Sequence, residues 1–311
     1  MATLYITHDA FLEHDTGEWH PERADRIRAI DRVLSGETFQ NLHRVEAPPA
    51  TREQIVRAHR ETYFDFLERA QPSQELVPLD DGDTIMSPKS WEAALRSVGA
   101  GIQAVDELMQ GLAGNAFCLV RPPGHHAEAN KAMGFCLFNN AAIAAFHAQA
   151  AHGAERVAVV DFDVHHGNGT QSMFWDRPDC FYASTHQMPL FPGSGGISER
   201  GEMGNIVNAP LRAGDGGEQF REAFESVILP ALRRHAPDLI VVSAGFDAHR
   251  ADPLANINLV DEDYAWVTRK LIDVARERCG GRLVSLLEGG YDLTALSRSV
   301  AVHVQALLEA S

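Results

Sequence analysis

"VVDFDVHHGNG", residues 159–169, places three titratable side chains directly after a run of apolar residues. In an extended chain, side chains at positions i, i+2 and i+4 point to the same side, with about 6.6 Å between successive members. Asp161, Asp163 and His165 are therefore expected to line one face at the end of a strand. Because burying unpaired carboxylates is costly, this pattern indicates a site for a divalent cation. A hydrogen-bonded network around a helix cap is the alternative.

Apolar runs of this kind recur along the chain and alternate with segments of helical periodicity. Near-continuous apolar strands separated by helices are typical of a parallel sheet that is covered by helices on both faces. No repeat, low-complexity tract or linker interrupts the pattern, so the sequence predicts a single α/β domain over residues 1–311. We predict strands over 3–7, 116–120, 156–162, 180–185, 238–245 and 282–290, and helices over 21–34, 88–111, 139–153, 217–235 and 261–280.

The composition is that of a globular protein that can bury a sizeable core: 311 residues, of which 45% are hydrophobic and 23% are charged. A formal net charge of −16 argues against nucleic acid as a partner. The N-terminus does not resemble a signal peptide, and no apolar run reaches the roughly 18 residues of a membrane span. We therefore expect a soluble, cytoplasmic protein with no membrane partner. The sequence leaves the oligomeric state open, and a homo-oligomer is one outcome.

Polar, glycine-rich segments follow four of the predicted strands: "RPPGHHAEANKAMGFC", "DVHHGNGTQ", "VVSAGFDAHRADP" and "EGGYDL". In open α/β sheets ligands bind beyond the carboxyl ends of the strands, so these segments should meet at one edge. A catalytic zinc ion usually has three protein ligands and one open position. Asp252, on the loop after the 238–245 strand, is well placed to join Asp163 and His165 as the third ligand.

Two further features suggest proton transfer at this edge. His125 and His126 lie side by side in a proline-rich loop, and an imidazole is the natural proton carrier near neutral pH. Tyr291 follows two glycines and could donate a hydrogen bond to a developing oxyanion. Phe135 and Phe191 could wall a narrow apolar channel. A pair of surface histidines, a tyrosine packed in the core and core phenylalanines are the structural alternatives. We expect His147, His152, His235 and His303 to be ordinary surface or helix residues.

The motifs "RPPGHHAE", "GFCLFNN", "DFDVHHGNGTQ", "FPGSG", "SAGFDAHRADPL" and "EGGYDL" occur in this order. Together they resemble the histone deacetylase family, which includes bacterial deacetylase-like amidohydrolases and acetylpolyamine amidohydrolases. The resemblance runs from about residue 20 to residue 293. It implies an arginase/deacetylase-type fold and a zinc-dependent hydrolase that removes acetyl or other acyl groups from lysine side-chain amides. Acetylpolyamines or other small acyl amines are the alternative substrates.

The resemblance also implies roles for individual residues. Asn168 stands where many relatives have aspartate beside the second histidine, which looks like the class II branch. A neutral partner should leave His126 less basic than a carboxylate would. Iron(II) is an alternative to zinc in the cell, since oxygen and nitrogen ligands accept both. The implied sets are Asp163, His165 and Asp252 for zinc; His125, His126, Tyr291, Asp161 and Asn168 for catalysis; Gly134, Phe135, Phe191 and Leu259 for the substrate channel; and Asp161, Asp163, His165, Ser184 and Thr185 for a structural potassium ion.

Two other classes of function remain open at this stage. A binuclear manganese hydrolase of the arginase type would need another carboxylate just after His165, where His166, Gly167 and Asn168 stand. A non-catalytic module that binds acyl ligands would bind metal without hydrolysing any acyl amide. The complete set of ligands, base and tyrosine argues against this second class. Signatures of a serine nucleophile elbow, a dinucleotide-binding loop and a phosphate-binding loop are missing from the sequence.

Overall fold

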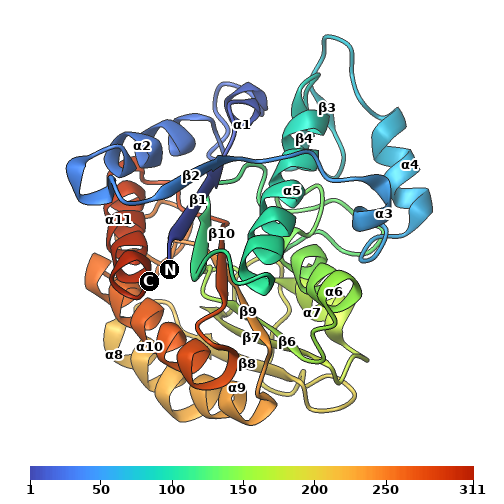
Figure 1. Cartoon of the computed structure of the whole chain (residues 1–311). Helices are drawn as coiled ribbons and strands as arrows, with labels where there is room; N and C mark the ends of the chain where they lie inside the picture. The colour runs from blue at the N-terminus through green and yellow to red at the C-terminus, as the bar shows by residue number, and fades with distance from the viewer.

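The computed structural model describes residues 1–311 and contains one large sheet between two layers of helices (Figure 1). The strand order is β2-β1-β5-β10-β9-β6-β7-β8, and all neighbouring strands are parallel. The predicted parallel α/β sheet is confirmed. Its strands are β1 (Thr3–Thr7), β2 (His43–Glu46), β5 (Asn115–Cys118), β6 (Val157–Asp161), β7 (Cys180–Gln187), β8 (Ile206–Leu211), β9 (Leu239–Ala244) and β10 (Leu283–Leu287); β3 (Val77–Pro78) and β4 (Ile85–Met86) form a small antiparallel pair.

Helices cover both faces of the sheet. On one face α5 and α6 pack on each other and on the central strands, whereas α2, α10 and α11 lie on the opposite face (Figure 1). None of the helices combines the length and the apolar character that crossing a membrane requires. The helices are α1 (Ala10–Glu13), α2 (Asp25–Leu34), α3 (Arg52–Ile55), α4 (Glu61–Arg69), α5 (Ser90–Met109), α6 (Asn140–His152), α7 (Asn168–Phe174), α8 (Gly217–Ala223), α9 (Leu229–His235), α10 (Asp261–Cys279) and α11 (Leu293–Glu309), with a 3₁₀ turn η1 (Glu37–Phe39) and a π-helical turn η2 (Phe224–Ile228).

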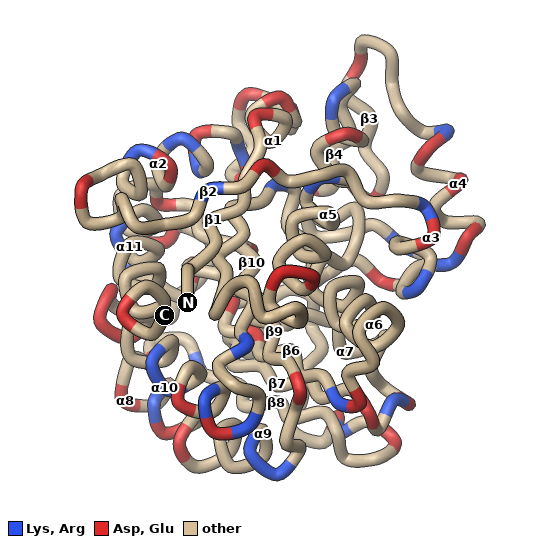
Figure 2. Tube along the Cα trace, viewed as in Figure 1, with Lys and Arg blue, Asp and Glu red and all other residues tan.

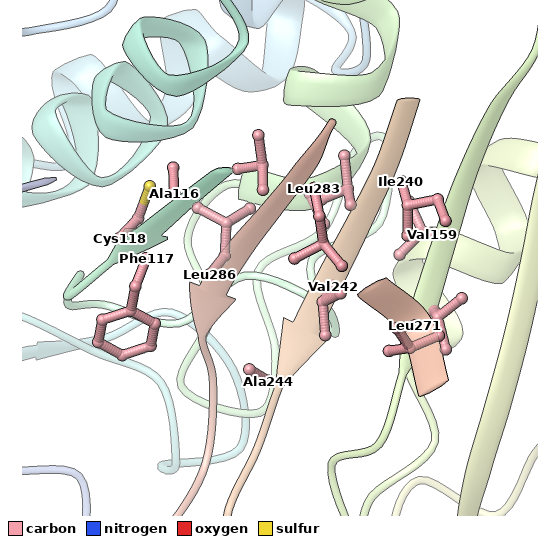
Figure 3. Packing of buried hydrophobic residues seen from close by; sticks show 14 of the residues in the cluster. Ala116, Phe117, Cys118, Val159, Ile240, Val242, Ala244, Leu271, Leu283 and Leu286 are labelled. Atoms are coloured by element: carbon pink, nitrogen blue, oxygen red, sulfur yellow. The ribbon is translucent and has the colours of Figure 1, made fainter. Parts of the chain in front are cut away.

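The central strands are apolar along their length because both of their faces are covered. Every residue of β6, β9 and β10 is buried. Val242 of β9 and Leu286 of β10 are core residues on neighbouring strands, and Leu271 of α10 belongs to the same cluster (Figure 3). Charged residues are found mainly on the helices and loops around these strands (Figure 2). The continuous apolar runs in the sequence therefore correctly predicted that helices cover both faces of the sheet.

Several elements around the sheet differ from the sequence prediction. Strands β2 and β8 were not predicted: β2 is short and largely exposed, and β8 carries Asn208 and Pro210. Both lie at the edges of the sheet, where polar residues and proline are tolerated. Helix α11 was also missed, and the predicted helix 217–235 contains the π-helical turn η2 between α8 and α9.

The order of the strands brings distant parts of the sequence to one edge. Strands β9 and β10 come last in the chain of strands, yet they lie between β5 and β6. The carboxyl ends of β5, β10, β9 and β6 are therefore neighbours, as expected at a crevice where the strand order changes direction. All four of the polar segments singled out in the sequence follow one of these strands.

Candidate active site

Three groups that could hold a metal ion meet at the carboxyl ends of β6 and β9. The Nδ1 atom of His165 lies 3.2 Å from an oxygen of Asp163 and 3.1 Å from an oxygen of Asp247. One ligand atom of each residue lies within 4.8 Å of the other two. The side chains of Asp163 and Asp247 are only 1% and 0% exposed. Two carboxylates and one imidazole nitrogen that converge in this way form a donor set for one divalent cation.

Asp247 lies next to His165 in this structure, with one oxygen 3.1 Å from Nδ1. Asp252, the third ligand predicted from the sequence, follows the same strand; burial and the charge of Asp163 raise its pKa to about 6, so it belongs to the same acidic cluster. Its two oxygens accept backbone hydrogen bonds, one from Tyr291 at 2.7 Å and one from Leu254 at 3.0 Å, which tie it to the backbone that carries Tyr291. Asp247 instead accepts a hydrogen bond from the backbone N–H of Val164 at 2.8 Å, which fixes it beside β6.

The tandem histidines lie side by side, with 4.0 Å between their ring centroids, and have different partners. The Nδ1 atom of His125 lies 3.0 Å from a carboxylate oxygen of Asp161. The Nδ1 atom of His126 lies 2.9 Å from the amide oxygen of Asn168. Each side-chain oxygen orients one ring.

Their surroundings shift the pKa values of the two histidines in opposite directions. Burial lowers the pKa of His125, but the charges of Asp161 and Asp163 outweigh it and raise this pKa well above its usual value. Burial, together with the positive charges of His125 and His165, holds the pKa of His126 well below its usual value. The surroundings of His125 favour a charged ring, and those of His126 favour a neutral one. Such a divergence of pKa values is typical of an acid and a base.

The carboxylates in this cluster favour positive charge beside them. Burial lowers the pKa of His165, but hydrogen bonds and charges from Asp163 and Asp247 raise it to about 10. Burial and the charge of Asp163 raise the pKa of Asp247 to about 7. Buried acids this close together are stabilised by a cation.

A cavity of ≈ 230 Å³ leads to these groups. Tyr291 lines it, and burial raises the pKa of its phenol well above the usual value, so the hydroxyl remains a hydrogen-bond donor. Phe135 and Phe191 form apolar walls, and Gly134 lies over His126. Leu259 is fully buried in the core and does not line the cavity; Leu254 does, so the sequence prediction was wrong by one leucine. The residues around the cavity are Asp83, Pro123, His125, His126, Gly134, Phe135, His165, Leu190, Phe191, Leu254, Gly289 and Tyr291.

Three glycines leave room for the buried carboxylates. A Cβ atom at Gly289 would lie 2.1 Å from Asp247 and 2.6 Å from Asp163, and one at Gly245 would lie 2.1 Å from Asp163. A Cβ atom at Gly167 would lie 2.3 Å from Asp161. These distances are too short for any side chain, so the glycines allow the acids to approach the backbone.

Glu288 is a functional residue that the sequence analysis did not assign. Its Oε2 atom accepts hydrogen bonds from the backbone N–H groups of Gly124 at 2.7 Å and His125 at 3.2 Å, and its Oε1 atom accepts from Ser243 at 3.1 Å. Glu288 therefore fastens the loop of the tandem histidines to β9 and β10. Its position directly before "GGY" at the end of a strand was the available signal.

The chain matches the histone deacetylase domain over residues 20–307. It belongs to the histone deacetylase family. The histone deacetylase-like amidohydrolase of Pseudomonas aeruginosa is 43% identical over 87% of this chain and 71% of its own length. Histone deacetylase 14, chloroplastic, of Arabidopsis thaliana is 40% identical over 99% of this chain and 77% of its own length. The crystal structure of the HDA15 HD domain superposes with a TM-score of 0.94 at 36% identity, covering 99% of this chain and 88% of that one.

Membership of the histone deacetylase family makes this chain a hydrolase of the deacetylase and amidohydrolase type. The recognition made from the ordered motifs is thereby confirmed, as is the family fold. The geometry agrees with such chemistry, because two adjacent histidines, a phenol and one imidazole of the acidic cluster line one cavity.

Proposed function

We propose that this histone deacetylase-family enzyme removes acetyl or other acyl groups from lysine side-chain amides with the help of a zinc ion. The observation that carries the proposal is that His126, His165 and Tyr291 line one narrow cavity, with Asp163 beside His165 and Asp252 beside the backbone of Tyr291. As expected from the sequence, Asp163, His165 and Asp252 are the proposed zinc ligands. The aromatic walls suit the long methylene chain of an acyl-lysine, whose amide would then reach the polar floor. A single catalytic domain over residues 1–311 is part of the proposal.

The donor set fits a zinc ion. Asp163, His165 and Asp252 offer two carboxylates and one imidazole, and zinc in catalytic sites typically takes three such ligands and keeps an open position. The charges of Asp163 and Asp247 raise the pKa of His165 to about 10 against the effect of burial, which supports a cation at this place. When bound, such an ion polarises an amide carbonyl and makes water more acidic. Iron(II) fits the same donors and is the alternative in the cell.

The chain's own residues would carry the protons. His126 is neutral, and its Nε2 atom has a free lone pair when Nδ1 donates to Asn168, so it takes a proton from the attacking water. The Tyr291 hydroxyl donates a hydrogen bond to the oxygen that becomes negative as the carbonyl is attacked. His125, charged through Asp161, or His126 after its protonation, then gives a proton to the departing amine.

We further propose that Asp161, Asp163, His165, Ser184 and Thr185 hold a structural potassium ion. Asp161 of β6 lies opposite Ser184 of β7 in the sheet, so both residues are at the same level behind the metal-binding group. Asp161 is fully buried, and burial raises its pKa, so a nearby cation would stabilise its ionised form.

The decisive assay compares an acetyl-lysine peptide with acetylputrescine, using protein loaded with zinc and protein treated with a chelator. Hydrolysis of the peptide that disappears with the metal and returns with added zinc supports the proposal. Faster hydrolysis of acetylputrescine would assign the small-amine alternative. Tight metal binding without hydrolysis of either substrate would contradict the proposal and favour a binding module.

The arginase-type alternative has little support from the site. A second metal ion would need further carboxylates beside the first group, but His166 points elsewhere, with its ring nitrogens 2.8 Å from Ser194 and 3.0 Å from Gln171. Asn168, the next polar residue, is engaged by His126. Metal analysis that gave two manganese ions per chain would favour this alternative.

A further inference from the structure

Glu128, the last residue of "RPPGHHAE", lies behind the catalytic base and has no role in the mechanism above. Its Oε1 atom accepts a hydrogen bond from the side-chain amide nitrogen of Asn168 at 2.9 Å. The amide oxygen of the same Asn168 lies 2.9 Å from Nδ1 of His126. The three side chains thus form a line that runs from a cavity of ≈ 620 Å³, which Glu128 and Asn168 line, to the base.

We propose that Glu128 is a positioning residue that sets the tautomer of His126 by fixing which way the amide of Asn168 faces. This inference rests on the proposed function, in which His126 is the base. An ionised carboxylate only accepts hydrogen bonds, so Glu128 requires the NH₂ end of the amide to face it. The amide oxygen must then face His126, and it too only accepts. His126 is therefore protonated at Nδ1, and its Nε2 lone pair is free to take a proton.

Without Glu128 the amide of Asn168 would be free to turn round. Its NH₂ group would then face Nδ1 of His126, which would accept, and the ring hydrogen would move to Nε2. A histidine protonated at Nε2 cannot remove a proton from water. Two weaker acceptors would remain near the amide nitrogen, the backbone carbonyl of His126 at 3.4 Å and the sulfur of Met133 at 3.3 Å. Neither matches the short hydrogen bond to the charged carboxylate of Glu128 at 2.9 Å.

The backbone around Glu128 is built to keep this contact. Gly169, next to Asn168, approaches the carbonyl of Ala127 so closely that a Cβ atom there would lie 2.2 Å from the oxygen. The backbone N–H of Gly169 donates to the carbonyl of His125 at 3.1 Å. The start of α7 and the loop that carries Glu128 are therefore pressed together, which leaves Asn168 little room except between Glu128 and His126.

The arrangement orients the base without charging it. A carboxylate directly on His126 would favour a second imidazolium 4.0 Å from His125, which already carries a positive charge through Asp161. Through the neutral amide of Asn168, Glu128 fixes the direction of the hydrogen bonds, while its negative charge stays one residue further from His126. The asparagine and the glutamate therefore work as a pair.

The test uses zinc-loaded full-length protein with an acetyl-lysine peptide, or with acetylputrescine if that is the better substrate. We expect Glu128→Ala to lower kcat about 10- to 100-fold, the usual effect of losing a residue that orients a ligand or base, while KM and zinc content stay close to wild type. Glu128→Gln can still accept from Asn168 and should stay within about fivefold of wild type, since it exchanges a charged hydrogen bond for a neutral one. Glu202→Ala, which changes an exposed acid lining the same cavity, is the matched control and should leave kcat unchanged.

A double variant separates positioning from a merely structural role. Asn168→Asp alone puts two carboxylates 2.9 Å apart and should lose at least about tenfold in kcat. Adding Glu128→Gln supplies an NH₂ donor to the new aspartate, which still accepts from His126, so the double variant should be faster than Asn168→Asp. This comparison also decides the matter if Glu128→Ala does not fold. Wild-type turnover by Glu128→Ala, or no improvement of Asn168→Asp by the second substitution, would overturn the inference.

The tautomer can be measured without any turnover. In ¹⁵N-histidine NMR spectra, with the His126 signals assigned by their loss in His126→Gln, wild type should show the hydrogen on Nδ1, and Glu128→Ala should show it wholly or partly on Nε2. An unchanged tautomer in Glu128→Ala would contradict the role of Glu128. Absence of hydrolysis by wild type together with the expected tautomers would refute the proposed function and leave the positioning intact.

Discussion

At the scale of single residues, the site contains two adjacent imidazoles that differ in what lies behind each ring. His125 has the carboxylate of Asp161 at 3.0 Å, and His126 has the amide of Asn168 at 2.9 Å. Both rings are buried. The charges of Asp161 and Asp163 raise the pKa of His125, whereas burial and the charges of His125 and His165 lower the pKa of His126. The proposed acid and base are thus neighbours in the chain.

Replacing the hydroxyl of Tyr291 tests the hydrogen bond to the oxyanion. We expect Tyr291→Phe to lower kcat about 10²- to 10³-fold, the usual effect of removing one such donor. The hydroxyl makes no hydrogen bond to another side chain, so the midpoint of thermal unfolding should not change. Steady-state kinetics and a thermal melt check both parts. Turnover close to wild type would remove Tyr291 from the mechanism.

Two aspartates of one loop are candidates for the third zinc ligand. We expect Asp252→Asn to weaken zinc binding by about 100-fold or more, because it removes one of the three proposed donors. Asp247→Asn should weaken it about 10-fold, because Asp247 contacts His165 and helps to orient it. Zinc is measured by mass spectrometry after dialysis against a zinc buffer. Loss of metal in Asp247→Asn but not in Asp252→Asn would make Asp247 the third ligand.

At the scale of elements, the loops after β9 and β10 build the floor of the site together. The backbone N–H of Phe246 donates to the carbonyl of Gly289 at 3.0 Å, and the backbone N–H of Gly289 donates to Asp163 at 2.8 Å. The two loops and the end of β6 are therefore joined at one point. Gly289 lies at that point and has no space for a side chain.

The substitution Gly289→Ala should disturb all three segments at once. Its Cβ atom would lie 2.1 Å from Asp247 and 2.6 Å from Asp163, so we expect a loss of about 1–3 kcal/mol in the free energy of unfolding and loss of zinc binding. Gly216→Ala, where the nearest atom lies at 3.5 Å, is the control and should differ little from wild type. Urea unfolding and metal analysis provide the measurements. Normal zinc content in Gly289→Ala would show that the loops after β9 and β10 can shift to make room for the added methyl group.

The sequence predicted those parts of the site that depend on local geometry. Asp163 and His165 share a face because they are two residues apart at the end of a strand, and this alternation needs no knowledge of the rest of the chain. The choice between Asp247 and Asp252 depends on how a loop turns, and that turn is set by hydrogen bonds to the distant Gly289 and Gln187. Leu254 and Leu259 were confused for the same reason.

The two edge strands were not predicted from the sequence for a different reason. A buried strand must be apolar, whereas an edge strand is free to carry polar residues, and β2 and β8 do so. Glu288 was overlooked because its partners are backbone N–H groups of a loop more than 160 residues away, which no local pattern encodes.

At the scale of the whole molecule, the core contains titratable groups that the reaction does not use. His303 of α11 was expected to be an ordinary helix or surface residue, but it is 1% exposed and lies among Phe117, Phe162 and Phe246. Its ring nitrogens are 2.6 Å from Thr268 and 2.8 Å from Ser285. Burial lowers its pKa to about 3, so the folded protein holds it neutral.

This buried histidine predicts a loss of stability in acid. Between pH 6.5 and pH 3 the unfolded chain binds a proton at His303 that the folded chain does not, so the free energy of unfolding falls as the pH falls through this window. From pH 7.5 to pH 5.5 the loss from this one group is about 1.4 kcal/mol. His303→Gln lacks the titration, so the difference in unfolding free energy between wild type and this variant should shrink by that amount. Urea unfolding at both pH values checks it; a difference independent of pH would contradict the assignment.

The placement of β9 and β10 between β5 and β6 has a consequence for how the protein is made. Because these two strands leave the ribosome after all the others, the earlier part of the chain can form only two separate half-sheets, β2-β1-β5 and β6-β7-β8, with a gap between them. The last two strands fill this gap, and the loops that follow them bring Asp247, Glu288 and Tyr291 to the site. The sheet is therefore completed in the same late step as the active site, so an incompletely synthesised chain has no assembled active site.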